Sequence, residues 1–336
     1  MNDAEGRRAF LGALFREGGG SIRFDRWMQE PLYHPDLGYY TANIRDIGAR
    51  GDFTTWPVFE DSLAAGMARW LQARRPPSGA WNVIEVGAGT GTLALAVLRQ
   101  LGRWKAPHYH LVEISPVLRD RQKKRLRWRK ASWHSDLKSA LESVGGHAFL
   151  ISNELVYAFP CRVFRRTAGG WEELFVGVQG GQAVERWQAA GDLPDSSAFD
   201  HDWNPGQRIE VQESFRQWIA RWSPSWKSGA MLVIDYGATS PAVYRQRPQG
   251  TLRAYAHHQR LEGPGVLAAF GRRDITCDVN FSDVSRFASQ AGIACHPPVT
   301  LGTFLAGTAS GRLLEAGGAA DQFQVMEGRP DFQQRG

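Results

Sequence analysis

Hydrophobic residues recur at helical spacing in the first part of the chain, where they predict helices over residues 1–30 and 60–75. The first helix presents Phe10, Leu11 and Leu14 on one face, and the second presents Leu63, Met67, Trp70 and Leu71. Residues 31–59 lie between them and are rich in Gly, Pro and aromatic side chains. This segment is therefore expected to be an irregular but ordered loop.

From residue 80 onward, short apolar runs alternate with amphipathic stretches, a pattern that predicts strands connected by helices. Such alternation favours a parallel sheet with helices on both faces. The predicted strands cover 81–89, 108–115, 132–137, 147–154 and 229–237, and the predicted helices cover 90–102, 116–129, 137–144, 208–222 and 282–292. Gly-Gly turns within 161–205 predict inserted hairpins, and a final strand pair is expected to end near 323–326.

The first predicted strand ends in a glycine loop with the sequence VIEVGAGTGTL. Gly87, Gly89 and Gly91 let the chain turn tightly and bring a ligand against bare backbone. A dinucleotide fingerprint would need glycine at position 92, which is Thr92 here. The spacing instead matches the E-x-G-x-G-x-G loop, starting at Glu85, that seats S-adenosylmethionine (SAM) in methyltransferases.

Acidic residues follow the second and third predicted strands. Glu113 lies 22 residues after Gly91, where a carboxylate can accept hydrogen bonds from both ribose hydroxyls. Asp136 ends the third strand and could accept a hydrogen bond from the adenine amino group. The glycine loop alone could be only a tight strand-to-helix turn, but the loop and the two acids together predict a SAM site.

Composition narrows the class of protein further. The chain has 336 residues, 43% of them hydrophobic, which is enough for one large core and a smaller lobe. Its formal net charge of +6 suggests an acidic partner, although the charge is not gathered in a tail. No apolar run is long enough to span a membrane, and the N-terminal sequence lacks the apolar core of a signal peptide, so a cytoplasmic protein is expected.

Cysteine usage points to a reducing compartment. Cys161, Cys277 and Cys295 are widely spaced, and the chain has no C-x-x-C pair. This pattern argues against a zinc site and against a disulfide framework, so no metal is predicted.

The order and spacing of ten motifs identify the chain as a member of the MidA-like SAM-dependent methyltransferases, a family that includes the mitochondrial assembly factor for respiratory complex I. The resemblance extends over residues 20–325. The motifs are PLYHPDLGYY, GDFTTWP, VIEVGAGTGTL, HLVEIS, NELVYAFP, RIEVQESFRQW, VIDYG, GTLRAY, RRDITCDVNF and GTFL.

This resemblance implies an α/β fold, namely a Rossmann-like, seven-stranded class I SAM methyltransferase domain with an N-terminal helical and loop cover and an inserted substrate-side lobe. It divides the chain into five segments. These are the cover over the cofactor site (1–78), the first half of the Rossmann-like domain (79–160), an inserted β-rich segment (161–206), the second half of the domain (207–240), and a C-terminal lobe completing the sheet and the substrate side (241–336).

The resemblance also implies an activity, in which an arginine of a partner protein is N-methylated and SAM becomes S-adenosylhomocysteine. The implied partner is a respiratory-complex subunit or an assembly intermediate. The covering loop would place Gly51, Asp52 and Phe53 against the cofactor. Val58 and Tyr157 are departures, because the family has acidic residues at both positions.

Arginine methylation needs a carboxylate that orients the guanidinium and favours loss of its proton, since the pKa of the free side chain is above about 12. Glu154, at the open end of the fourth strand, is the leading candidate. Asn153 is expected nearer the amino or carboxylate end of the cofactor, and Asp235 ends the fifth strand in the same crevice. A helix cap with a surface ion pair is the alternative for the Asn-Glu pair, and a simple turn is the alternative for Asp235.

Other candidates are less specific. Tyr157, His258 and Tyr39 are expected on the substrate side. Tyr39 could equally be an aromatic core residue or a cover over the cofactor, and a lone His258 is more often structural than catalytic. Glu210 is expected to cap or pair along its predicted helix.

Residues 119–130 contain eight Lys or Arg in twelve positions. The simpler interpretation is a solvated helix face with Leu118, Leu126 and Trp128 turned inward, and the other is contact with RNA or an acidic protein. The pattern lacks the interleaved aromatic residues of a single-strand platform, so nucleic-acid binding is not favoured.

Three functions therefore stay open at the level of sequence. Protein arginine methylation is favoured over methylation of RNA or a small molecule, and over a SAM-binding assembly factor with little turnover. The sequence does not identify the methyl acceptor or the oligomeric state.

Overall fold

The computed structural model describes residues 3–44, 57–102, 106–256, 259–268, 270–306 and 319–331. The chain forms two compact units, each assembled from segments that are distant in sequence. The first consists of Met1–Ile44, Ala158–Phe215 and Ser240–Asp278, and the second of Arg45–Tyr157, Arg216–Thr239 and Val279–Gly336. What the segments of 1–78 and 161–206 contribute to cofactor and substrate stays a prediction.

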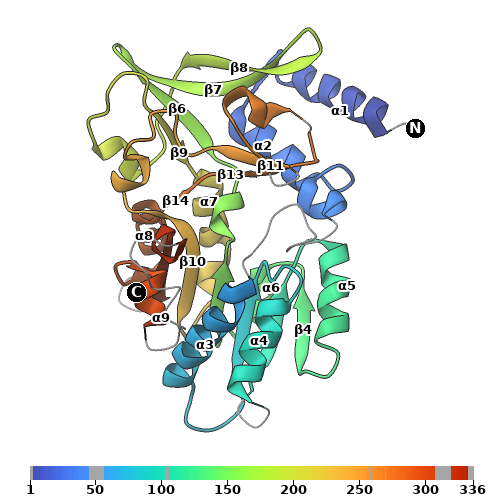
Figure 1. The fold of residues 1–336 in the computed structure, drawn as a ribbon, viewed down its shortest axis with the longest axis vertical. Coiled ribbons are helices and arrows are strands. Elements are labelled where there is room, and N and C mark those ends of the chain that lie inside the picture. The colour runs from blue at the N-terminus through green and yellow to red at the C-terminus, as the bar shows by residue number, and fades with distance from the viewer. Residues whose placement is uncertain are drawn as a thin grey trace. The chain divides into compact units, whose positions relative to one another are not determined.

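The second unit is an α/β fold around a mixed sheet (Figure 1). Its strands are β2 (Asn82–Val86), β3 (His108–Val112), β4 (Ala131–His134), β5 (Phe149–Asn153), β10 (Met231–Ala238), β14 (Val279–Asn280), β15 (Ile293–Cys295), β16 (Val299–Thr300) and β17 (Phe323–Pro330). Among the described residues the sheet has nine strands, with the order β15-β17-β10-β5-β2-β3-β4, β14 beside β10 and β16 beside β17. The run from β4 to β10 is parallel, and β17 is antiparallel to β10.

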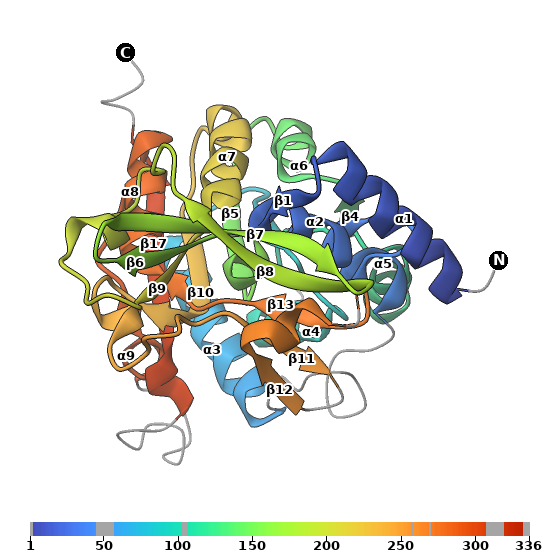
Figure 2. The same cartoon turned by 90° about the horizontal axis from the view of Figure 1, so that it is seen from above.

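Helices cover both faces of this sheet. Figure 2 shows α6, α7 and α8 on one face and α3 and α4 on the other. The helical elements are α3 (Pro57–Arg74), α4 (Thr92–Leu101), α5 (Pro116–Arg125), α6 (Leu137–Ser143), η3 (Val156–Ala158), α7 (Glu213–Trp222), η5 (Ser223–Ser225), α8 (Phe281–Gln290), α9 (Leu301–Leu305) and η9 (Ala319–Gln322). A buried core joins α3 and α4 to the sheet through Leu63, Met67, Val97, Leu98, Val83, Leu111 and Ile151.

The sequence sets these boundaries locally. Gly91, in a left-handed conformation, is the N-cap of α4, and Gly102 ends that helix. Ser115 caps α5 by accepting a hydrogen bond from Leu118 N, and Pro116 occupies the first helical turn, where its missing N–H costs nothing. The alternation of strands and helices predicted from residue 80 is confirmed from β2 through β5.

The first unit is mostly antiparallel β-structure. Its elements are α1 (Asp3–Glu17), β1 (Ser21–Arg23), α2 (Phe24–Tyr33), the π-helix η1 (Tyr39–Asn43), β6 (Arg162–Thr167), β7 (Gly170–Gln179), β8 (Gln182–Ala189), η4 (Ser197–Asp200), β9 (Arg208–Val211), η6 (Ala242–Tyr244), β11 (Arg253–Ala256), β12 (Gln259–Glu262), η7 (Gly263–Leu267) and β13 (Asp274–Thr276). In the described residues one sheet has the order β1-β7-β6-β9 with β8 beside β7, and a smaller one has the order β12-β11-β13.

Two predicted helices are wrong in part. Residues 208–211 form β9, paired with β6, and α7 begins only at Glu213. The short run Arg208–Val211 fits a strand as well as a helix, and pairing with β6 decides between them. Within 1–30, Gly19 and Gly20 adopt left-handed conformations that break the helix before β1, which pairs with β7.

Within the ranges that the structure describes, no helix combines the length and apolar character needed to cross a membrane.

Three histidines lie together on β3 and β4 of the central sheet. His110 Nδ1 is 3.0 Å from His134 Nε2, and the rings of His108 and His110 have centroids 4.2 Å apart. Burial is the main cause that lowers the pKa of all three, that of His110 to about 4.

Acid should therefore destabilise the protein through these imidazoles. Their pKa values in the folded state lie below the unfolded value of about 6.5, so the unfolded chain binds more protons as the pH falls from about 6.5 toward about 4. The free energy of unfolding decreases over that window. We expect the melting temperature of His110→Gln to fall less than that of the wild type between about pH 7 and about pH 5, by scanning calorimetry. Equal losses in the two proteins would contradict this account.

Candidate active site

The order of the strands in the second unit determines where a ligand can bind. β3 and β4 are added to one side of β2, whereas β5 is added to the other side. The order of the strands therefore reverses between β2 and β5, although all of them are parallel. Ligands of open α/β sheets bind at the carboxyl ends of the strands at such a switch point. The glycine loop after β2 and the Asn-Glu pair at the end of β5 both lie at this edge.

The glycine loop packs closely against two neighbouring segments. Gly87 and Gly91 have φ angles of 70° and 75°, in the left-handed region that favours glycine. A Cβ added at Gly87 would lie 3.0 Å from Leu155 Cδ1, and one at Gly91 would lie 3.1 Å from Gln122 Cγ. The loop therefore touches both the segment after β5 and the inner face of α5.

Gln122 links the glycine loop to the acid at the end of β3. Its side chain is fully buried and donates from Nε2 to Gly89 O at 2.8 Å and to Glu113 Oε2 at 3.1 Å. Trp133 Nε1 donates to Gln122 Oε1 at 3.1 Å, which fixes the orientation of the amide. Both polar atoms of the Gln122 side chain are thus engaged in holding two parts of one site together.

Glu113 is suited to the ribose role predicted for it. Ser115 N donates to its Oε1 at 2.9 Å, while Gln122 engages the other oxygen. A carboxylate offers about four acceptor positions, so capacity is left for two hydroxyl donors. Burial raises the pKa of Glu113, and the hydrogen bonds from Ser115 and Gln122 oppose that rise.

Glu85 is buried beneath the loop. Tyr109 of β3 donates its hydroxyl to Glu85 Oε2 at 2.5 Å. Burial raises the pKa of Glu85 to about 7, opposed by the hydrogen bond from Tyr109, with a smaller rise from the charge of Glu113. Alternation along β3 turns Tyr109 and Leu111 to the same face of the sheet, and it could have indicated a buried partner for Glu85.

Asp136 has a structural partner of its own. It is the N-cap of α6, where its Oδ1 accepts from Ser139 N at 2.8 Å and its Oδ2 accepts from Ser135 Oγ at 3.0 Å. The backbone hydrogen bond from Ser139 is the main cause that lowers the pKa of Asp136. The carboxylate lies after β4, at the same edge of the sheet as the glycine loop, and its contact with adenine stays a prediction.

The residues at the end of β5 have an unusual backbone. Glu154 has a φ of 53°, a left-handed conformation that costs most non-glycine residues roughly 1–2 kcal/mol. Its N–H donates to Ile234 O at 2.8 Å, and Asn153 Nδ2 donates to its Oε1 at 3.3 Å. Strain of this kind persists where the surrounding structure enforces it, and it is frequent at functional sites.

Asp235 is the residue that enforces it. Its fully buried Oδ2 accepts hydrogen bonds from Leu155 N, Val156 N and Tyr157 N at 2.8–3.2 Å, and its Oδ1 accepts from Tyr236 N at 3.0 Å. Burial and the charge of Glu154 raise the pKa of Asp235, while these N–H donors oppose the rise. Oδ2 thus fixes the chain that follows β5 to β10, while Oδ1 is engaged within β10 itself.

Tyr157 does not point into open solvent. It is buried, and its ring stacks on that of Tyr236 with centroids 5.0 Å apart and an interplanar angle of 29°. Phe323 of β17 meets Tyr236 edge to face at 5.8 Å. An aromatic pair therefore occupies the strand ends beside Glu154, where the family resemblance led us to expect an acid.

Some predicted residues cannot be placed in this geometry. Gly51, Asp52, Phe53 and His258 lie outside the described residues. Tyr39 belongs to the first unit, where it is buried in η1 and meets Tyr40 edge to face at 5.2 Å.

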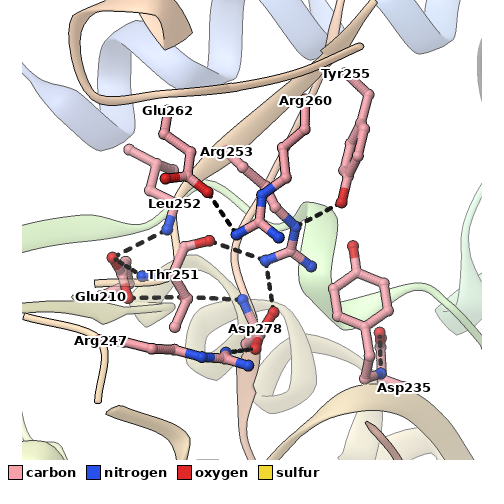
Figure 3. Close-up of polar contacts among 11 residues, drawn as sticks. Glu210, Asp235, Arg247, Thr251, Leu252, Arg253, Tyr255, Arg260, Glu262 and Asp278 are labelled. Carbon is pink, nitrogen blue, oxygen red and sulfur yellow. Dashed lines mark hydrogen bonds and ion pairs between the residues drawn. The ribbon is translucent and has the colours of Figure 1, made fainter. Parts of the chain in front are cut away.

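The first unit holds a separate buried polar cluster (Figure 3). Glu210 of β9 accepts from Thr251 N and from Thr251 Oγ1, both at 2.9 Å, and Arg253 of β11 donates to Asp278 Oδ1 at 2.5 Å. Arg247 forms a second ion pair with Asp278. The interpretation of Glu210 as a helical residue is wrong, because its partner strand β6 places it in a sheet and the 251–252 backbone needs its carboxylate. This cluster supports the first unit.

Gln122 and Tyr109 were not predicted as site residues. Gln122 lies four residues from both Leu118 and Leu126, so all three share one helix face. Leu118 and Leu126 turn inward as predicted. A polar residue between two inward-facing leucines is the signal that could have identified Gln122.

The site fits the adenosylmethionine cofactor on its own geometry. A loop of left-handed glycines opens the backbone at the end of β2, and a buried carboxylate with spare acceptor positions stands at the end of β3. Together with the parallel run of strands from β4 to β10, these features define the class of SAM-dependent methyltransferases.

Comparison with known proteins identifies the family within this class. The family model described as "Putative S-adenosyl-L-methionine-dependent methyltransferase" matches residues 62–299. Protein arginine methyltransferase NDUFAF7, mitochondrial, of Mus musculus is 31% identical, over 85% of this chain and 70% of that protein. The Homo sapiens protein of the same name is 29% identical, over 85% of this chain and 69% of its own length.

Comparison with solved structures leads to the same class of protein. A Burkholderia thailandensis protein crystallised with bound S-adenosyl-homocysteine has a TM-score of 0.82 and 26% identity, over 97% of this chain and 92% of that one. A native crystal structure of a Burkholderia thailandensis protein gives a TM-score of 0.78, with the same identity and coverage. The chain belongs to this family of S-adenosylmethionine-dependent methyltransferases, and S-adenosylmethionine is its cofactor.

The bridge made by Gln122 predicts a loss of cofactor affinity when it is removed. Gln122→Leu leaves the Gly89 carbonyl and the Glu113 carboxylate without their buried donor, at a cost of about 1–3 kcal/mol for each group. We expect S-adenosylhomocysteine to bind about tenfold to a hundredfold more weakly, measured by titration calorimetry.

Trp133→Phe is the matched variant for this prediction. It removes the N–H that orients the Gln122 amide, together with part of the indole ring, but leaves both hydrogen bonds donated by Gln122 in place, so it should cause a smaller loss of affinity. Wild-type affinity in a folded Gln122→Leu protein would show that the bridge does not support cofactor binding.

Proposed function

We propose that the protein N-methylates an arginine side chain of a partner protein. The observation that supports this most directly is Glu154, a carboxylate held in a left-handed conformation at the end of β5, in the segment that contacts the glycine loop. A guanidinium is recognised by carboxylates through charge-assisted hydrogen bonds. The relatives named protein arginine methyltransferase support the same acceptor.

The contacts described above suggest which residues would hold the cofactor and which would act on the acceptor. The glycine loop, Glu85, Glu113 and Asp136 would hold the cofactor, which supplies a methyl group on an electrophilic sulfonium. Glu154 would orient the guanidinium and accept the proton that its nitrogen loses as the new N–C bond forms. Asn153, which donates to Glu154, would set the direction of that carboxylate and contact the cofactor.

Asp235 would act through Glu154. Its oxygens are engaged by the backbone on both sides of the site, so we assign it a positioning role in place of direct contact with the acceptor. Tyr157, stacked on Tyr236, would offer an aromatic face to the guanidinium, an interaction worth about 0.5–2 kcal/mol. A cation–π contact would replace part of the attraction that an acid provides at this position in the family.

The remaining predicted contacts stand as proposals. We infer that the covering loop brings Gly51, Asp52 and Phe53 to the cofactor, and that His258 and Tyr39 belong to the substrate side. We also infer that the seven-strand path from β15 to β4 corresponds to the Rossmann-like core of class I methyltransferases.

The proposal extends to the substrate protein and to the cellular compartment. We propose a respiratory-complex subunit or assembly intermediate as the substrate and the cytoplasm as the compartment. Cys161, Cys277 and Cys295 are all free thiols, which suits a reducing compartment. Cell fractionation with an antibody against the chain would test the compartment directly.

The function can be tested before the acceptor is identified. Purified protein would be incubated with labelled SAM and an extract of cells that lack its gene, and the labelled fractions analysed by mass spectrometry. Methyl-arginine in a discrete protein is the expected result. Label confined to RNA or to small molecules would overturn the proposal, and no transfer by a chain that binds S-adenosylhomocysteine would indicate an assembly factor.

Glu154→Gln separates chemistry from binding. The amide keeps the shape of the side chain but cannot accept the proton, so we expect at least about a hundredfold loss of turnover. Affinity for S-adenosylhomocysteine should stay within about twofold of the wild type, by calorimetry. Glu142→Gln, a change at an exposed glutamate of α6, is the control and should leave both quantities unchanged. Full activity in Glu154→Gln would remove Glu154 from the mechanism.

A further inference from the structure

The positive charge of this protein is concentrated in one segment. Residues 119–130 carry eight cationic side chains and one carboxylate, a net +7, whereas the whole chain carries +6. The rest of the chain is therefore close to neutral. A general bias toward arginine would have spread the charge, so the concentration needs a local explanation.

Four of these eight cations are turned outward at the end of α5 and in the turn that follows it. Lys123, Lys124, Arg127 and Lys130 are exposed, whereas Leu126 beside them is buried. Among the residues that the structure describes, none of these four cations forms an ion pair with a carboxylate. We call these four residues and Trp128 the α5 surface. Figure 1 shows α5 beside the edge strand β4.

Trp128 protrudes from this surface. The expectation that it turns inward is wrong, because 84% of the residue is exposed, and the Arg127 guanidinium lies 5.2 Å from the centroid of its ring. Exposing most of an indole forgoes about 2–3 kcal/mol of burial. The cause is geometric: Leu126 takes the inward position at the end of the helix, and the chain turns immediately after it.

The turn that carries Trp128 is fixed at both ends. Leu126 N donates to Gln122 O at 2.8 Å, and Arg129 N donates to Leu126 O at 2.8 Å. On the far side, Tyr109 N donates to Lys130 O at 3.0 Å, which joins the turn to β3. The indole and its neighbouring cations are thus presented on a preorganised loop, so little ordering entropy would be lost on binding.

We propose that the α5 surface binds a single-stranded nucleic acid, with phosphates on the four cations and a base stacked on Trp128. Phosphate contacts give sequence-independent affinity, and an exposed aromatic ring takes any base because every base has a π-face. The proposal does not depend on the identity of the methyl acceptor. Lys123 and Lys124 lie on the outward side of the helix whose inward side holds Gln122, and the rest of the α5 surface lies in the turn that follows the helix.

Two other polyanions fit the observations less well. The Asp and Glu side chains of an acidic peptide would satisfy the cations but have no ring to stack on an exposed indole. An anionic membrane would favour apolar side chains gathered around the Trp. The other exposed apolar residues of this region, Ile114 and Val117, lie toward the opposite end of α5, which is about 15 Å long.

Fluorescence anisotropy of a labelled twelve-nucleotide oligouridylate, titrated with the full-length protein, tests the proposal. We expect binding that weakens roughly fiftyfold between about 50 mM and about 200 mM salt, as release of counterions from four phosphates of a single strand requires. Trp128→Ala should weaken binding about fivefold to a hundredfold through lost stacking. Lys123→Glu with Lys124→Glu should weaken it about tenfold or more.

Matched controls separate the surface from net charge and from misfolding. Arg99→Glu with Lys227→Glu changes the charge by the same amount at exposed positions outside the α5 surface, and should change affinity by less than about twofold. All variants should bind S-adenosylhomocysteine like the wild type, because none of the changed residues belongs to the cofactor site.

Three results would overturn the proposal. Polyglutamate of equal charge that binds as tightly as the oligonucleotide, with no effect of Trp128→Ala, would identify an acidic-protein surface. Cosedimentation with phosphatidylserine vesicles in the absence of oligonucleotide binding would identify a membrane surface. An equal loss in the charge-matched control would show attraction without a site.

Discussion

A single buried carboxylate organises the catalytic edge of this protein. Three successive N–H groups after β5 converge on one oxygen of Asp235, and the other oxygen takes an N–H from its own strand. Breaking this arrangement would leave a buried charge and several backbone donors unsatisfied, the costliest outcome for a polar group in a protein interior. The chain after β5 therefore has one available path. That path forces Glu154 into its left-handed conformation, sets Leu155 against Gly87 and stacks Tyr157 on Tyr236.

Helix α5 has two chemically distinct sides. Inward, Leu118, Gln122 and Leu126 repeat every four residues and connect the core to the cofactor loop. Outward, the same turns present exposed cations, and the following turn presents an indole. One helix thus joins cofactor binding to the protein surface, with its neutral buried residues isolated from the charged ones by the 3.6-residue period.

Local patterns in the sequence were sufficient for the parallel strands from β2 to β5 and for the turn conformation of the glycine loop. The runs that become β2, β3 and β5 are too short and apolar for anything but buried strands, and the loop glycines have φ angles that few other residues adopt. The Asn-Glu pair was located because polar residues at the end of a buried strand are costly without a reason. The same patterns could not show that Asp235 orders the backbone, because its donors come from a segment 78–80 residues away.

Expectations failed where a neighbouring residue, near or distant in sequence, decides the outcome. The strand conformation of Glu210 depends on pairing with β6, which a four-residue run cannot reveal. Trp128 was expected inward because of its apolar ring, but Leu126 already occupies that position at the end of the helix. Gln122 was hidden among cations until its spacing from two leucines was considered in three dimensions. In each case the residue type suggested one role and the neighbours imposed another.

The backbone at Glu154 carries an evolutionary consequence. Glutamate codons become glycine codons by one base change, and glycine is the residue that a left-handed conformation accommodates without strain. A single mutation from Glu to Gly at this position would therefore relieve the backbone strain and favour folding, while it removes the carboxylate. A chain under selection for stability alone would be expected to carry glycine here. Under the mechanism proposed above, the glutamate at this position therefore serves chemistry at a cost to folding stability.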